Sequence, residues 1–76
     1  MSRHLPAISG PRLVRALERA GFVVLRQRGS HVSMEKTTRE GNWRTVVPLH
    51  RELRPGTLGD ILKQSGLSKE DLRELL

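Results

Sequence analysis

Cysteine is absent from the 76-residue chain. The protein therefore forms no disulfide and offers no thiolate to a metal ion, which argues against a small secreted scaffold and fits a reducing compartment. Its three histidines, His4, His31 and His50, stand far apart, and no pair has the spacing of a helical metal site. A glycine-rich phosphate loop is lacking as well. We expect no metal and no cofactor.

Long apolar runs are also missing. The longest uninterrupted one, Phe22 to Leu25, has four residues, far short of the roughly 20 that span a bilayer. The start of the chain, Met1 to Pro6, has no apolar core of the kind found in secretory signals. We therefore expect a cytoplasmic protein that does not contact membranes.

Aromatic side chains are limited to Phe22 and Trp43. Proteins that read unstacked bases usually stack them on several aromatic rings. If the partner is a nucleic acid, the composition therefore favours contacts to the sugar–phosphate backbone over contacts to the bases.

Positive charge is abundant and unevenly distributed within a net charge of +6. Residues 1–54 contain 11 Lys or Arg against 4 Asp or Glu, a balance of +7, whereas residues 55–76 contain 3 against 4, a balance of −1. Eleven of the 14 positive residues are Arg, whose planar guanidinium suits phosphate. This pattern indicates a polyanionic partner for the first part of the chain. A role of these arginines in solubility alone is the alternative.

The apolar spacing predicts one α+β domain that covers residues 1–76, with a flexible segment at about 1–8. A helix is expected between a cap at Ser9 or Gly10 and the stop at Gly21, with arginines on its polar side. Three strands follow, at about 22–26, 31–35 and 43–48, with a turn at Gly29 and a polar connection over 36–41 that a hairpin turn at 40–42 closes. A second helix starts at Pro55 and ends at Gly66, and a short one follows Ser68 with Leu72, Leu75 and Leu76 inward.

This order, α-β-β-β-α with a short C-terminal helix, matches a double-stranded-RNA-binding domain: a three-stranded antiparallel sheet with helices on one face. In the second strand, Val32 and Met34 share one face, and His31, Ser33 and Glu35 share the other. If the two apolar residues pack inward, His31 is directed away from the core.

Several short motifs together resemble those of the HicA-type mRNA interferase toxins of bacterial toxin–antitoxin systems. In chain order they are Gly21-Phe22, Arg28-Gly29-Ser30-His31, Val47-Pro48-Leu49-His50, Pro55-Gly56-Thr57-Leu58, Ile61-Leu62-Lys63-Gln64 and Gly66-Leu67-Ser68. Each motif is short, and the order and spacing of the set carry the resemblance, which extends over nearly the whole chain.

The resemblance implies the toxin of a type II system: a small ribonuclease that cleaves mRNA, inhibits translation and is neutralised by a HicB-like antitoxin covering its active site. It also implies that the catalytic histidine corresponds to His31. His50 matches a motif position too, either as a second proton-transfer group or, as we favour, in a structural role.

Histidine suits RNA transesterification, because an ordinary imidazole exists in both protonation states near neutral pH. Around His31, four residues are candidate RNA-binding cations by their place in the sequence: Arg26, Arg28, Lys36 and Arg44. Gly29 would allow a phosphate to approach the backbone, and Ser30 would donate a hydrogen bond or simply serve the turn.

A non-catalytic RNA-binding module of the double-stranded-RNA-binding type is the alternative function. Such modules often carry a lysine cluster where the second helix begins. Here the segment from Arg54 to Asp60 holds one positive residue and one acid, which counts against this function. A DNA-contacting regulator ranks last, because no recognition helix is evident.

Overall fold

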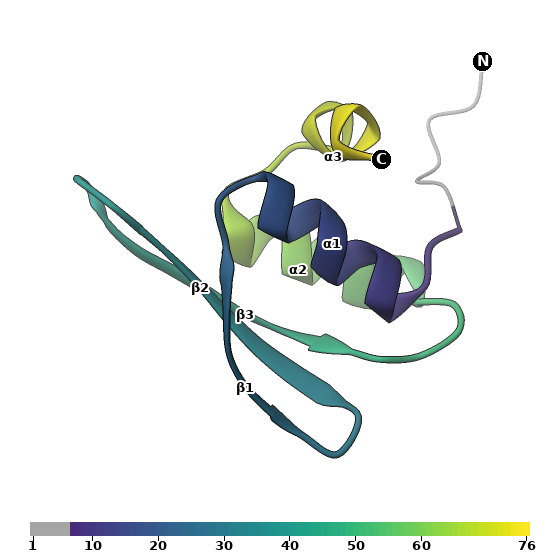
Figure 1. Ribbon diagram of the computed structural model, residues 1–76. Coiled ribbons are helices and arrows are strands. Elements are labelled where there is room, and N and C mark those ends of the chain that lie inside the picture. Colours follow the sequence, from purple (N-terminus) through teal and green to yellow (C-terminus); the bar gives the residue numbers. More distant parts are fainter. Residues whose placement is uncertain (1–6) are drawn as a thin grey trace.

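The protein is described by a computed structural model of residues 7–76, in which one helix precedes three strands and two helices follow them. The elements are α1 (Gly10–Arg19), β1 (Val23–Arg28), β2 (His31–Thr38), β3 (Gly41–Pro48), α2 (Pro55–Ser65) and α3 (Lys69–Leu75). The strands form an antiparallel sheet in the order β1-β2-β3. Helices α1 and α2 lie on the same side of this sheet, and the other side is open (Figure 1). The predicted α-β-β-β-α arrangement is confirmed.

The strands β2 and β3 are longer than their sequence pattern suggests. Residues 36–38, predicted as part of a polar connection, continue β2 and pair with Trp43, Asn42 and Gly41 of β3. Strand β1 reaches only as far as the pair Val23–Glu35. The end of the β2–β3 hairpin therefore extends beyond the rest of the sheet and beyond the helices (Figure 1). Backbone pairing across the hairpin, not apolar burial, keeps this polar segment in strands.

Helix α1 is held at its start by a side-chain cap and a close backbone contact. The hydroxyl of Ser9 accepts a hydrogen bond from the Arg12 amide at 3.2 Å, which satisfies one of the free donors of the first turn. The Gly10 amide donates to the carbonyl of His50 at 2.8 Å. A Cβ atom on Gly10 would lie 2.0 Å from the Pro48 carbonyl oxygen, so a larger residue here would have to displace α1 from the segment after β3.

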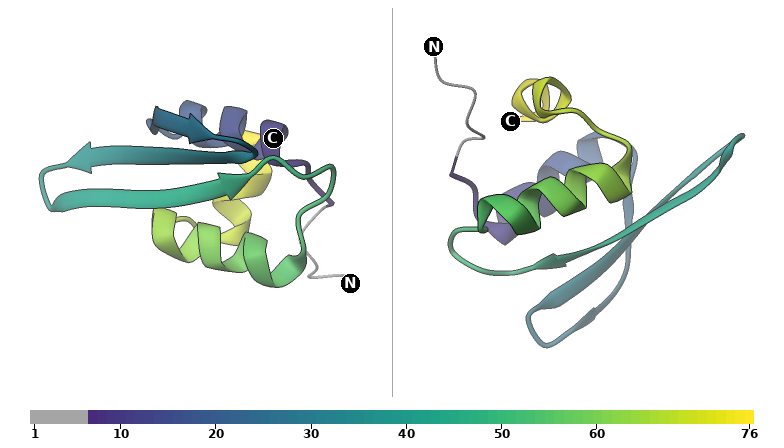
Figure 2. Two further views of the ribbon diagram at one scale, coloured as in Figure 1. Left: turned by 90° about the horizontal axis from the view of Figure 1, so that it is seen from below. Right: turned by 180° about the vertical axis from the view of Figure 1, so that it is seen from behind.

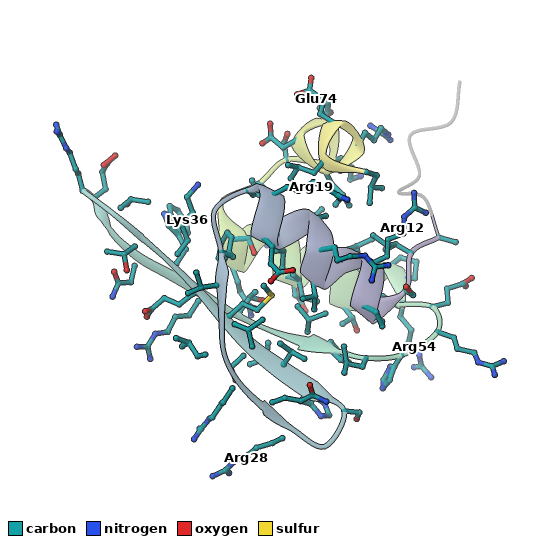
Figure 3. All side chains as sticks on the ribbon, viewed as in Figure 1. Arg12, Arg19, Arg28, Lys36, Arg54 and Glu74 are labelled. Atoms are coloured by element: carbon teal, nitrogen blue, oxygen red, sulfur yellow. The ribbon has the colours of Figure 1, made fainter. Side chains whose placement is uncertain are left out.

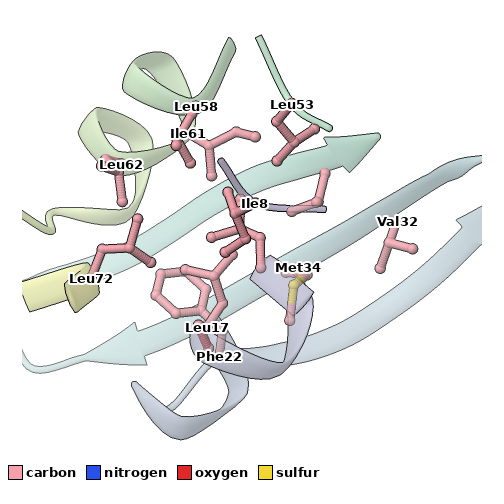
Figure 4. Packing of buried hydrophobic residues seen from close by; sticks show 13 residues of the cluster. Ile8, Leu17, Phe22, Val32, Met34, Leu53, Leu58, Ile61, Leu62 and Leu72 are labelled. Atoms are coloured by element: carbon pink, nitrogen blue, oxygen red, sulfur yellow. The ribbon is translucent and has the colours of Figure 1, made fainter. Parts of the chain in front are cut away.

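The core lies between the helices and the inner face of the sheet (Figure 4). Val32 and Met34 point into it, as predicted, together with Val47 of β3. Ile8 falls in the segment predicted to be flexible, but it is 2% exposed, and its carbonyl accepts a hydrogen bond from the Leu53 amide. The apolar side chain of Ile8 thus belongs to the core. Of the rest of the segment, Ala7 is exposed, and residues 1–6 lie outside the described residues.

Helix α3 closes the chain against α1. Its cap is reciprocal: the Ser68 hydroxyl accepts from the Asp71 amide, and the Asp71 carboxylate accepts from the Ser68 amide. Leu72 is fully buried, whereas Leu75 and Leu76 are only partly covered. Arg19 of α1 donates to the Leu75 carbonyl at 2.9 Å, which ties the two helices together. Figure 2 shows α1 on the β1 side of the fold and α2 on the β3 side.

None of the helices within residues 7–76 has both the length and the apolar character needed to cross a bilayer.

Candidate active site on the open face of the sheet

The β1–β2 hairpin turns through a two-residue loop, Gly29-Ser30, between the paired residues Arg28 and His31. Gly29 has a positive φ of 56° and is the only one of the two loop residues with positive φ, as in a type II′ turn. Two hydrogen bonds brace the loop. The Leu49 amide donates to the Ser30 carbonyl at 2.6 Å, and the Gln27 side chain donates to the Gly29 carbonyl at 3.0 Å. The turn is thereby tied to the segment that follows β3.

His31 is the first residue of β2 and stands on the open face of the sheet. Its neighbour in sequence, Val32, is buried on the helix side, and side chains alternate along a strand. The imidazole is exposed and makes no hydrogen bond or ion pair within residues 7–76. It is therefore accessible to a substrate that lies across the sheet.

A β-bulge at Leu25 separates two halves of β1 whose side chains alternate out of step. Val24 pairs with the buried Met34, but Arg26 pairs with Ser33, so Leu25 is an extra residue between them. Residues directly opposite one another on neighbouring strands share a face. Regular alternation from Val24 would direct Arg26 to the helix side, whereas the bulge directs it to the open face.

The same change of register applies to Arg28, which pairs with His31. Gln27, between the two arginines, pairs with the buried Val32 and faces α1. Both arginines of β1 thus share the open face with His31. The sequence pattern nominates them only by their proximity to His31, and nothing in the alternation of residues 22–28 reveals the bulge.

Arg44 of β3 also lies on the open face, opposite Glu35 of β2. Its Nε atom donates to the Glu35 carboxylate in an ion pair. The guanidinium remains largely exposed, with 71% of the side chain accessible. Arg44 therefore keeps free donors, although Glu35 partly offsets its charge.

Lys36 lies on the other side of the sheet. It pairs with Trp43, and its side chain passes over Gly21 on the helix side. Lys36 and Arg28 are well separated in space (Figure 3). Three of the four predicted RNA-binding cations therefore share a face with His31, and Lys36 does not.

His50 and Ser30, the other two candidate site residues with polar side chains, form hydrogen bonds through their backbone carbonyls. His50 follows β3, and its carbonyl accepts from the Gly10 amide. Its exposed imidazole, like the hydroxyl of Ser30, has no hydrogen-bond partner in the described part of the chain. The Ser30 carbonyl ties the β1–β2 turn to Leu49 after β3, and the His50 carbonyl ties that same segment to the start of α1. Among residues 7–76 there is no cluster of three or more His, Asp or Glu that could hold a metal ion.

Fold and site together define a small, basic α+β domain whose open sheet carries one accessible imidazole beside two arginines. A family model described as the HicA toxin of bacterial toxin–antitoxin systems matches residues 10–67. The chain belongs to this family, as its motifs indicate. It is a toxin component of a toxin–antitoxin system, and family membership implies an antitoxin partner. No curated protein matches the chain.

Proposed function

We propose that the protein is a metal-independent endoribonuclease that cleaves mRNA in the cytoplasm and so inhibits translation, with His31 as its catalytic acid/base. A HicB-like antitoxin would neutralise it by covering the open face. The observation that carries this proposal is the convergence of His31, Arg28 and Arg26 on one accessible face. Membership of a toxin family supports it.

The reaction that suits this face is transesterification at a phosphodiester. The 2′-oxygen of the RNA bonds to phosphorus while its proton passes to a base. The P–O5′ bond then breaks while the leaving oxygen gains a proton. The products are one end with a 2′,3′-cyclic phosphate and one with a 5′-hydroxyl. An imidazole is suited to either proton transfer, and such catalysis is worth about 10² to 10⁴ in rate.

The two arginines of β1 would act on the phosphate itself. A guanidinium presents several fixed donors that match phosphate oxygens. Arg28 stands directly opposite His31, and Arg26 stands opposite Ser33, two pairs further along the strands and next on the same face. A phosphate held beside the imidazole would therefore meet both cations, which would stabilise the additional negative charge of the phosphorane. This arrangement needs no metal ion.

Incubation of the purified protein with an end-labelled RNA in the presence of a chelator tests the activity. The wild-type chain should yield fragments with cyclic phosphate ends, and His31→Ala should lower the cleavage rate by about 10² to 10⁴. Lys63→Ala, on exposed α2 surface, is the matched control and should cleave normally. Undiminished cleavage by His31→Ala would rule out the catalytic assignment. A shifted but uncut RNA band with wild-type protein would instead favour the non-catalytic binding module.

His50→Ala, in the same assay, addresses the second proton-transfer group. The His50 imidazole contacts no described residue, whereas its carbonyl accepts from Gly10. We therefore expect cleavage close to that of the wild type, since the substitution leaves the backbone hydrogen bond in place. A loss as large as that of His31→Ala would make His50 the second group.

A further inference from the structure

Strand β1 is an open edge of the sheet. It pairs with β2 on one side, and the described chain places no strand on the other. All six of its residues are exposed, and the apolar residues Val23, Val24 and Leu25 are 58%, 45% and 49% accessible. An edge of this kind presents backbone donors and acceptors that can pair with another strand. The arginines at positions 26 and 28 protect only its second half.

A groove of about 260 Å³ runs between this edge and α1. Its lining is mostly apolar, with Arg15 and Gln27 as the polar members, and consists of Pro11, Val14, Arg15, Val24, Gln27, Val32 and Leu49. Apolar surface that is open to water beside an unpaired strand edge is a combination that peptide-binding domains use.

The surroundings of the groove are positively charged. Arg12, Arg15 and Arg19 are exposed along α1, and Glu18 is the only acid on that helix. Arg26 and Arg28 stand at the far end of the edge strand. Figure 3 shows Arg12 and Arg19 projecting from α1. No acidic residue lines the groove itself.

We propose that the β1 edge and this groove form the docking site for an extended, acidic segment of the antitoxin. The segment would add to β1 as a fourth strand of the sheet. Because side chains alternate along a strand, every second one would point to the helix side. There an apolar side chain fills the groove beside Val14 and Val24, and acidic neighbours meet the arginines of α1.

Charge and chemistry favour an acidic peptide over a second copy of the chain and over RNA. A second copy of the chain brings another net charge of +6 to the same edge, which opposes association. RNA supplies the negative charge but has no strand-like backbone to pair with β1 and no aliphatic group for the groove. An acidic, partly apolar peptide suits the unpaired strand edge, the apolar groove and the arginines around it.

The proposal deepens the antitoxin part of the proposed function and does not depend on catalysis by His31. The added strand would leave its other side chains on the open face, beside Arg26 and Arg28. Occupation of the edge would therefore place the antitoxin beside the candidate active site, from where it can cover the open face.

Selection of random 12-residue peptides displayed against the purified chain tests the site. We expect enriched peptides in which an acidic residue stands two positions from an apolar one, so that both point to the helix side, and amide hydrogen exchange should show new protection in residues 23–28 when a synthetic copy of one binds. Arg15→Glu and Val14→Lys should each lower the affinity of the protein for that peptide by roughly tenfold or more, because each places an unfavourable charge at the groove. Lys63→Glu, which reverses a charge on α2, is the control and should bind as the wild type does.

Repeating the titration with His31→Ala separates this proposal from the enzymatic one. Peptide affinity should be unchanged in that variant, whatever happens to its cleavage of RNA. The docking site would be overturned by a selection that enriches nothing or only neutral or basic peptides, or by protection confined to β3. Protection of β1 that grows with protein concentration alone would assign the edge to a second copy, and protection of the same amides by single-stranded RNA would assign it to RNA.

Discussion

Arg28 and His31 face one another across the two-residue turn of the β1–β2 hairpin, on the side of the sheet that no helix covers. A bulge at Leu25, three residues before Arg28, shifts the alternation of β1 by one position, so Val24 faces the helices while Arg26 and Arg28 face the open side. A guanidinium and an imidazole thus share one accessible surface, at the end of the sheet that Leu49 ties down through its hydrogen bond to Ser30.

Replacing Arg28 should impair RNA cleavage more than replacing Lys36. If Arg28 holds the reacting phosphate, Arg28→Ala removes stabilisation of the phosphorane, and the rate should fall by about 10². Lys36→Ala removes an equal charge from the opposite side of the sheet, so only the general attraction to RNA should weaken. Cleavage rates for both variants at two salt concentrations provide the measurement. Equal losses would mean that neither cation contacts the phosphate during the reaction.

The helices and the inner face of the sheet follow closely from the sequence. Leu13, Ala16 and Leu17 recur at helical spacing and are all fully buried. Val32 and Met34 alternate with His31 and Ser33, and that alternation correctly predicts which face of β2 is inside. In both elements one side is apolar and the other polar, so a period can be read from residue types alone.

For the edge strand β1, residue types alone do not predict which side chains face the helices. The run Val23-Val24-Leu25-Arg26 has no polar–apolar alternation, so it does not reveal where the extra residue lies or that Arg26 and Arg28 turn toward His31. The sequence also does not reveal on which side of the sheet Lys36 lies, because the segment that it begins is polar throughout. Its side follows from the continuation of β2 beyond Glu35, where Lys36 pairs with Trp43 across the hairpin.

Deletion of Leu25 should remove the bulge and keep the site. Without this residue, Val24 and Arg26 become neighbours in sequence. They can stay opposite Met34 and Ser33 with regular alternation, so no pair of the hairpin needs to change. We expect the same cross-strand contacts between Arg28 and His31 in NMR spectra and RNA cleavage within about threefold of the wild type. If the spectra instead showed a shifted hairpin register, with Arg28 no longer opposite His31, the bulge would be necessary for the position of the β1–β2 turn.

Gly10 should be far less tolerant of substitution than Gly59. A Cβ on Gly10 would meet the Pro48 carbonyl oxygen at 2.0 Å, whereas a Cβ on Gly59 of α2 has nothing within 4 Å. Gly10→Ala must push α1 away from the segment after β3 and should cost about 1–3 kcal/mol, as overpacking does. Gly59→Ala should instead stabilise by roughly 0.5–1 kcal/mol, because alanine favours the helix. Urea unfolding of both variants would measure the difference, and similar destabilisation by the two would contradict the packing argument.

The cap of α3 should make the stability of the protein depend on pH in the acid range. Hydrogen bonds from the Ser68 amide and then from its side chain hold the pKa of the Asp71 carboxyl below its ordinary value. A carboxyl whose pKa is lower in the folded chain binds fewer protons there than in the unfolded chain. Its contribution is therefore complete above about pH 4, the ordinary range for an unfolded Asp, and is lost as the pH falls toward the lower pKa of the folded state.

Asp71→Asn isolates this contribution, because it keeps the shape of the cap and removes the titrating group. The unfolding free energy of the wild type should fall more steeply with decreasing pH below about 4 than that of the variant. Ser68→Ala provides the matched control: it removes the hydroxyl that accepts from the Asp71 amide and should cost about 1 kcal/mol. Parallel pH profiles for the wild type and Asp71→Asn would show that the carboxylate does not stabilise α3.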